Sequence, residues 1–100
     1  MFGFAMRAGK TVIGTELIER SLAHGSVRLV VISSGASDST KKRLTRKSKF
    51  YRVSAIEVQI STDELGRLLG KSYAPAAVAL TDEGLANEIK KAYAAIKDED

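Results

Sequence analysis

Four segments of the chain have the hydrophobic pattern of β-strands. Leu29–Ser33 and Ala76–Leu80 are continuous apolar runs between turn residues, which is typical of strands that are covered on both faces. The second run is built of small residues, so we expect a helix to pack closely against it. Ala55–Ile60 is a third predicted strand, and Thr11–Ile13 is a short β candidate near the start of the chain.

Helical spacing of apolar residues begins shortly after the β candidate Thr11–Ile13. Thr15 is the expected N-cap of this helix, because its hydroxyl can accept a backbone N–H, and Gly25 is the expected stop. Residues 2–8 are compatible with a further helical turn that ends at Gly9. The helix that begins at Thr15 has an apolar stripe, which consists of Leu17, Ile18, Leu22 and Ala23.

Two further helices follow the next two strands. One is expected from its N-cap Asp38 to about Ser48, and its many Lys and Arg residues place it on the outside of the domain. The other spans Thr62–Leu69, where Ser61 and Glu64 form a capping box that satisfies two free backbone N–H groups. Its predicted buried side chains are Leu65, Leu68 and Leu69.

The last helix follows the small-residue strand, and Thr81 and Asp82 are its expected caps. Its apolar stripe consists of Leu85, Ile89, Ala92, Tyr93 and Ile96. The alternation of buried strands with helices predicts an α/β protein with helices on both faces of a small sheet. We find no internal repeat or linker, so residues 1–100 form one predicted domain with enough apolar residues for a core.

Positive charge is concentrated in the first half of the chain. Residues 1–56 contain eleven Lys and Arg against three acidic residues, whereas residues 57–100 contain five against nine. The whole chain has a net charge of +4. One basic half on a single domain favours binding of a polyanion, although segregated surface charge without a ligand produces the same distribution.

Composition argues against several classes of function. The chain has no cysteine and one histidine, His24, so neither disulfides nor a metal site is expected. No apolar run reaches the roughly 20 residues of a membrane span, and a reducing cytoplasm is the expected location. His24 and the paired acids Asp82 and Glu83 are best explained by helix ends, so we expect neither an enzyme nor a bound cofactor.

Gly9-Lys10-Thr11 resembles the end of a phosphate-binding P-loop, but the rest of that motif is absent. The first glycine of the motif should stand at position 4, which is Phe4. Val12 and Ile13 then follow in place of the helix that a P-loop opens. Nucleotide hydrolysis is therefore not expected.

The stretch from Gly9 to Arg20 is nevertheless the best candidate for an anion site. Gly9 and Gly14 bracket the short strand, and a helix opens directly after the second glycine. The first turn of a helix has free backbone N–H groups and a partial positive charge, which suit phosphate oxygens or base edges. Lys10, Thr15 and Arg20 are the side chains expected around this nucleic-acid contact.

The basic helix and the aromatic residues each permit two interpretations. The helix Lys41–Lys49 is either a phosphate-contacting face or a solvated outer helix. Phe50 and Tyr51 offer base stacking, but we expect at least one ring to pack beneath the turn. Tyr73, in a loop, is the better stacking candidate, although it could simply cover the end of the sheet.

Several segments, taken in order, resemble the L7Ae/L30e superfamily of ribosomal and kink-turn-binding proteins, and most closely its small bacterial members. The resemblance covers nearly the whole chain. Its segments are Ala8-Gly9-Lys10 with Gly14, Leu29–Ser33 followed by Ala36–Lys42, Glu64-Leu65-Gly66 with Gly70-Lys71, and Val78–Ala86.

The resemblance implies a three-layer α/β/α sandwich around a small mixed four-stranded sheet, with Thr11–Ile13 as the extra strand. It also implies a non-enzymatic, monomeric RNA-binding protein associated with the ribosome or with translation, whose target is a kink-turn, a sharply bent RNA duplex. The RNA-binding residues that it implies are Gly14, Thr15, Glu16, Leu17, Arg20, Tyr73, Ala74, Pro75 and Ala76, and the predicted RNA face also includes Lys10 from the candidate anion site. Lys41 and Lys42 are possible auxiliary phosphate contacts.

The chain departs from the family pattern at the start of its first long helix. Strong kink-turn binders carry Gly-x-Asn-Glu-x-x-Lys at this place, where this chain has Glu16, Leu17 and Arg20 at the last three specified positions. Arg20 can still contact phosphate, but Glu16 is an acid facing a polyanion and Leu17 cannot accept a hydrogen bond from guanine. An alternative function is therefore a protein-interaction module of the translation or transcription machinery with weak or no specific RNA binding.

Overall fold

The computed structural model describes residues 9–99, with side chains through residue 95. The expected helical turn at residues 2–8 and the side chain of Ile96 lie outside this described part. Strands and helices alternate along it. In chain order they are β1 (Thr11–Ile13), α2 (Thr15–Ala23), β2 (Leu29–Ser33), α3 (Asp38–Phe50), β3 (Ser54–Val58), α4 (Thr62–Leu68), β4 (Ala77–Leu80) and α5 (Glu83–Glu99).

The four strands form one mixed sheet in the order β1-β4-β2-β3. β4 runs antiparallel to both of its neighbours, β1 and β2, whereas β2 and β3 are parallel. The central strands β2 and β4 are completely buried, as their apolar runs predict. The predicted mixed four-stranded sheet of an α/β protein is therefore confirmed.

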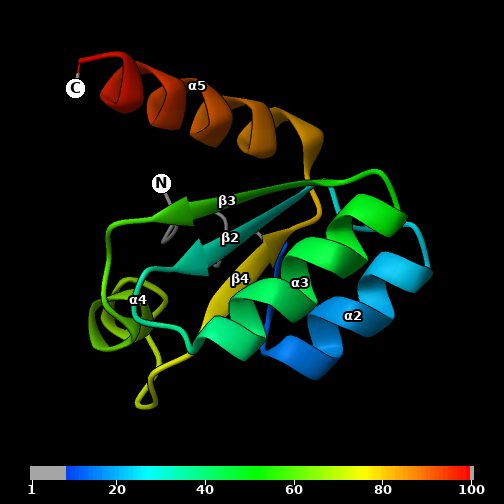
Figure 1. Ribbon diagram of the computed structural model, residues 1–100, viewed down its shortest axis with the longest axis horizontal. Helices are drawn as coiled ribbons and strands as arrows, with labels where there is room; N and C mark the ends of the chain where they lie inside the picture. The colour runs from blue at the N-terminus through cyan, green and yellow to red at the C-terminus, as the bar shows by residue number, and fades with distance from the viewer. Residues whose placement is uncertain (1–8, 100) are drawn as a thin grey trace.

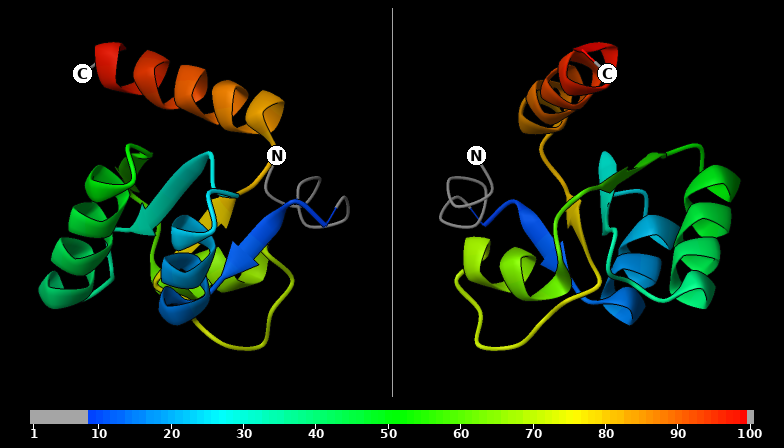
Figure 2. Two further views of the ribbon diagram at one scale, coloured as in Figure 1. Left: turned by 90° about the vertical axis from the view of Figure 1, so that its right-hand side faces the viewer. Right: turned by 60° about the vertical axis from the view of Figure 1, so that its left-hand side comes forward.

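Alternate residues of the central strands supply two separate hydrophobic cores. Leu29 and Val31 of β2 pack with side chains of α4 and α5 on one face of the sheet. Val30 and Ile32 pack with side chains of α2 and α3 on the other face. The sheet therefore lies between two helical layers, with α2 and α3 side by side (Figures 1 and 2). Ala77 and Ala79 of β4 belong to the second core, so their small size allows α2 to approach closely, as predicted.

Two helix starts differ from the sequence prediction by one residue. Gly14, and not Thr15, is the N-cap of α2, because the helix already includes Thr15. Ser37, and not Asp38, caps α3, and its hydroxyl accepts the Thr40 N–H at 3.3 Å. The predicted cap Ser61 is confirmed, since its hydroxyl accepts the Glu64 N–H at 3.1 Å.

The caps and stripes of the last two helices are largely as predicted. Asp82 caps α5, with a carboxylate oxygen 2.8 Å from the Leu85 N–H. Leu85 and Ile89 are buried, but Ala92 is exposed because α5 contacts the core mainly through its first turns. Leu65 of α4 and its C-cap Leu69 are buried as expected, whereas Leu68 is 45% exposed. That position was predicted wrongly because a seven-residue helix covers the sheet with one narrow face.

Candidate nucleic-acid interface

Three segments that are distant in the sequence meet at one end of the sheet, which we call the loop end. They are the β1–α2 turn at Gly14, the β2–α3 connection 34–37 and the loop Tyr73–Ala76 before β4. The register brings them together because Ile13 pairs with Val78 and the Ser33 N–H donates to the Ala76 carbonyl at 2.8 Å. Figure 2 shows the β1–α2 turn and the loop before β4 at the same edge.

The turn at Gly14 has a backbone conformation that only glycine adopts readily. Its φ is +107° and its ψ is 138°, and α2 begins at the next residue. The Gly14 carbonyl accepts the Ile18 N–H at 2.9 Å, but no side chain in the described part of the chain caps the start of the helix. The first-turn N–H groups of α2 therefore lack a side-chain acceptor, and they carry the positive end of the helix dipole.

The first turns of α2 present a mixed surface to solvent. Ile18 and Leu22 anchor the helix in the core, which turns Glu16, Leu17 and Arg20 outward. Leu17 is 51% exposed although it is apolar, so the core does not explain it. Arg20 makes no ion pair with any described residue. It is thus available to an anionic ligand.

The loop Tyr73–Ala76 is held by very close contact with α4. A Cβ built on Gly66 would lie 2.2 Å from the Tyr73 carbonyl oxygen and 3.2 Å from Pro75 Cδ. Pro75 is buried in this contact, so it positions the loop and cannot itself face a ligand. Tyr73, which is 55% exposed, and Ala74 form the accessible tip.

The buried hydroxyl of Ser33 links the β2–α3 connection to the residue Ile60 that follows β3. Its Oγ donates to the Ile60 carbonyl at 2.5 Å and accepts the Gly35 N–H at 3.0 Å. A buried, fully used hydroxyl makes a local network rigid. Nothing in the pattern around Ser33 pointed to this role, because the acceptor Ile60 is 27 residues away and only the pairing of β2 with β3 brings it close. Gly66 did carry a signal, since glycine inside a helix often marks a close backbone approach.

The structure does not bring Lys10 to the loop end, where we expected it beside Thr15 and Arg20. Lys10 precedes β1, and its carbonyl accepts the Thr81 N–H at 3.0 Å at the opposite end of β4. Its ammonium group lies 3.2 Å from the Asp82 carboxylate. The Leu85 backbone N–H and then Lys10 lower the pKa of Asp82. The three-residue strand β1 thus separates Lys10 from the other predicted site residues, and this correction removes it from the candidate surface.

Lys41 and Lys42 do lie near the loop end, in the first turns of α3. Lys41 pairs with Glu57 of β3 at 3.4 Å, whereas Lys42 is exposed and makes no ion pair with a described residue. The next residue, Arg43, binds Glu19 of α2. Its guanidinium group lies 2.5 and 2.8 Å from the two carboxylate oxygens of Glu19. This hydrogen bond and charge raise the pKa of Arg43. Of the basic residues in this turn, only Lys42 remains available.

No group of three or more His, Cys, Asp or Glu side chains within residues 9–99 is arranged to hold a metal ion. None of the helices in this range is both long and apolar enough to cross a membrane.

Known proteins share both the sequence pattern and the fold of this chain. The model of the ribosomal protein L7Ae/L30e/S12e/Gadd45 family matches residues 2–90. A solved protein of unknown function from Bacillus halodurans C has a similar fold, with a TM-score of 0.83, 30% identity and coverage of 90% of this chain and 89% of that one. A 15.5kD RNA binding protein from Giardia lamblia shares the fold at a TM-score of 0.73 and 16% identity, covering 88% of this chain and 73% of its own.

Curated relatives are similar over most of their length. The RNA-binding protein YlxQ of Bacillus subtilis is 37% identical over 89% of this chain and 87% of its own length. A large ribosomal subunit protein eL30 of Sulfolobus acidocaldarius is 33% identical over 79% of this chain and 76% of its own. The chain belongs to the ribosomal protein L7Ae/L30e/S12e/Gadd45 family, which confirms the resemblance drawn from its ordered segments.

Proposed function

We propose that this chain is a non-enzymatic RNA-binding protein that recognises kink-turn-like structured RNA at the loop end and acts in association with the ribosome or translation. The observation that carries the proposal is that two features share one end of the sheet: the α2 start at Gly14, which no described side chain caps, and the exposed tip Tyr73–Ala74. The names of the relatives in Bacillus subtilis and Sulfolobus acidocaldarius support it.

Each part of the loop end has a defined task in this proposal. The N–H groups at Gly14–Thr15 face phosphate oxygens or base edges in the groove of the bent duplex. Arg20 adds a charge-assisted contact from the second turn of α2. Tyr73 and Ala74 cover a nucleotide that protrudes from the bend, and Pro75 holds them against α4.

The central test compares three RNAs: a kink-turn, an unbent duplex and a single strand, each titrated at two salt concentrations. We expect preference for the kink-turn at both. Arg20→Ala should weaken kink-turn binding by about 1–3 kcal/mol, the range for a charge-assisted hydrogen bond. Arg46→Ala is the matched control, because Arg46 is also exposed and unpaired among described residues but lies midway along α3. Equal affinities of the two variants would refute the placement of the site.

Restoring the family pattern tests the two departures directly. Glu16→Asn removes an acid from the groove, and Leu17→Glu supplies an acceptor for guanine amino groups. The double variant should therefore bind the kink-turn more tightly than the wild type, by about 1–3 kcal/mol for a base contact of this kind. A weaker complex would show that the RNA does not enter along this face of α2.

A protein-interaction module is the second candidate function, and the 51% exposure of apolar Leu17 favours it. It predicts equal binding of the three RNAs with the same salt dependence, since only net charge would attract them. Under this candidate, Leu17→Ser would leave RNA affinity unchanged and would abolish binding to a ribosomal or translation-factor partner.

A further inference from the structure

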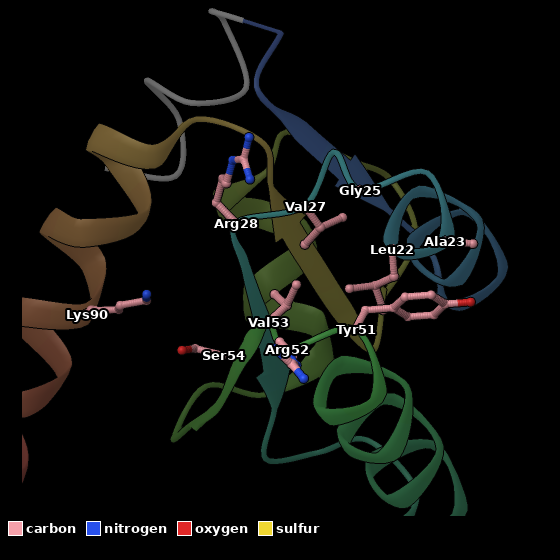
Figure 3. A pocket seen from close by; sticks show the side chains of 10 residues that line it. All are labelled: Leu22, Ala23, Gly25, Val27, Arg28, Tyr51, Arg52, Val53, Ser54 and Lys90. Carbon is pink, nitrogen blue, oxygen red and sulfur yellow. The ribbon is translucent and has the colours of Figure 1, made fainter.

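A second candidate site lies at the opposite end of the sheet, which we call the pocket end. A hollow of about 280 Å³ opens there between the end of α2, the turn after α3 and the middle of α5 (Figure 3). The register fixes this position, because Leu29 pairs with Ser54 and with Leu80 at the end of the sheet remote from Ser33. Leu22, Val27 and Val53 supply its apolar wall.

Three cationic side chains line this hollow, and none of its lining residues within the described part of the chain is acidic. Arg28, Arg52 and Lys90 come from three separate segments of the chain. None of them forms an ion pair with a described residue, unlike Lys10, which is paired with Asp82 at the same end. Three like charges around one hollow repel one another, so an anionic ligand would relieve an unfavourable arrangement.

Helix stabilisation explains only one of these three cations. Arg52 follows the C-terminus of α3, where a positive charge favours the helix dipole. Arg28 directly precedes β2, well past the end of α2, and Lys90 lies inside α5. Arg52 also has a φ of 60°, and it is the one non-glycine among the described residues with positive φ. Its side chain is thus held at the hollow by an uncommon backbone conformation.

Two aromatic rings stand beside the cations. Tyr51 lines the hollow, and Phe50 next to it is 77% exposed. Their ring centroids are 4.9 Å apart in an edge-to-face arrangement, so each ring supports the other without being buried. Both rings are exposed, Phe50 at 77% and Tyr51 at 36%, so the expectation that at least one of them packs beneath the turn is wrong. Exposed rings beside unpaired cations match a nucleobase attached to a phosphate.

A neighbouring hollow of about 320 Å³ extends the same surface along α3. It shares Arg52 with the first hollow and adds Lys49. Its lining also includes Ser48, whose Oγ is buried without a hydrogen-bond partner among the described residues. A buried hydroxyl without a partner is unfavourable unless a ligand or water satisfies it.

We propose that the pocket end binds a single-stranded RNA segment, with Arg28, Arg52 and Lys90 on its phosphates and Tyr51 and Phe50 against its bases. This inference rests on the proposed RNA-binding function and adds a second contact to it. An acidic peptide would satisfy the cations but has no planar group for the rings, so RNA is the better match. The two ends together would hold a folded RNA element and the single strand that flanks it.

The test uses the whole chain and two RNAs, a kink-turn alone and a single strand of about ten nucleotides. The pocket variant carries Arg28→Gln, Arg52→Asn and Lys90→Gln; asparagine tolerates the positive φ at position 52. The control variant carries Arg46→Gln, Lys47→Gln and Lys91→Gln, which removes the same charge from exposed helix positions outside both hollows. Polyglutamate serves as the competitor that represents an acidic protein.

The pocket variant should bind the single strand at least tenfold more weakly than the control variant, with a salt dependence lower by about two ion equivalents. Its kink-turn affinity should match that of the control. Adding Tyr51→Leu to the pocket variant should weaken binding of the single strand further, without changing the salt dependence of that binding.

Equal single-strand affinity of the pocket and control variants would overturn the proposal. Displacement of the single strand by polyglutamate at equal charge concentration would overturn it as well, since it would assign the site to an acidic protein. A third outcome separates the two proposals. If the wild-type protein shows no preference for the kink-turn but the pocket variant still binds the single strand more weakly than the control, the proposed function of the loop end is refuted and the second site is supported.

Discussion

The two ends of the sheet differ in what they expose. The loop end offers shaped backbone: an uncapped helix start at Gly14, a buried Ser33 network and a loop pressed against Gly66. The pocket end offers side chains, with Arg28, Arg52 and two aromatic rings around a hollow. Backbone shape is suited to reading a folded RNA, whereas cations and rings are suited to a flexible strand.

The two ends also differ in whether their cations are paired with acids. The basic half of the chain supplies most of the cations at both ends, and Lys90 is the exception. Near the loop end, however, Lys41 and Arg43 are already paired with acids. At the pocket end, Arg28, Arg52 and Lys90 have no acidic partner among the described residues. Net charge alone therefore does not show which of these cations are free of an acidic partner among the described residues.

Gly66→Ala should have the largest effect of the variants that test this contrast. The added Cβ would lie 2.2 Å from the Tyr73 carbonyl, so the loop must move away from α4. We expect a loss of about 1–3 kcal/mol in the free energy of unfolding, the usual cost of overpacking, measured by urea denaturation. Kink-turn affinity should fall as well, because Tyr73 is displaced.

The single-strand affinity of Gly66→Ala should stay at the wild-type value, since the pocket end does not contact α4. Gly84→Ala is the control, because there the only atom approached closely is the Asp82 carboxylate oxygen at 3.3 Å. A Gly66→Ala protein with unchanged stability and kink-turn affinity would show that the contact with Tyr73 does not position the loop.

A pair of glycine variants compares the two ends at matched positions. Gly14 and Gly25 both have positive φ, and a Cβ at either would meet nothing within 4 Å. Alanine should therefore cost stability through backbone strain alone, by about 1–2 kcal/mol at Gly25 and about 1–3 kcal/mol at Gly14, whose φ of +107° and ψ of 138° lie outside the left-handed helical region. Only Gly14→Ala should also weaken kink-turn binding, because it alters the start of α2. Equal RNA affinities of Gly14→Ala and Gly25→Ala would contradict the assignment of the loop end.

The acid-pH dependence at Asp82 should be the smallest effect. Its pKa is lowered in the folded protein, first by the Leu85 N–H and then by Lys10. The stabilisation is therefore complete above the unfolded pKa of about 4 and is lost as pH falls through the lower folded value. In Asp82→Asn, urea unfolding between about pH 4 and pH 2 should lose this part of the pH dependence. An unchanged profile would show that the carboxylate contributes no stability.

Local pattern was sufficient for most of the fold. The apolar runs determine β2 and β4, and the spacing of Ile18 and Leu22 gives the buried face of α2. The caps Ser61 and Asp82 were predictable because their hydrogen bonds reach only three residues along the chain. The ordered segments of the family indicated the mixed four-stranded sheet and the loop before β4.

Only the tertiary structure decided which residues share a surface. β1 runs antiparallel to β4, so its three residues, a length of about 10 Å, place Gly14 at one end of the sheet and Lys10 at the other. The contact of Gly66 with Tyr73 and the hollow between Arg28, Arg52 and Lys90 join segments from different helices and strands. Sequence patterns report burial and hydrogen bonding within a few residues, whereas these contacts depend on strand order and helix packing.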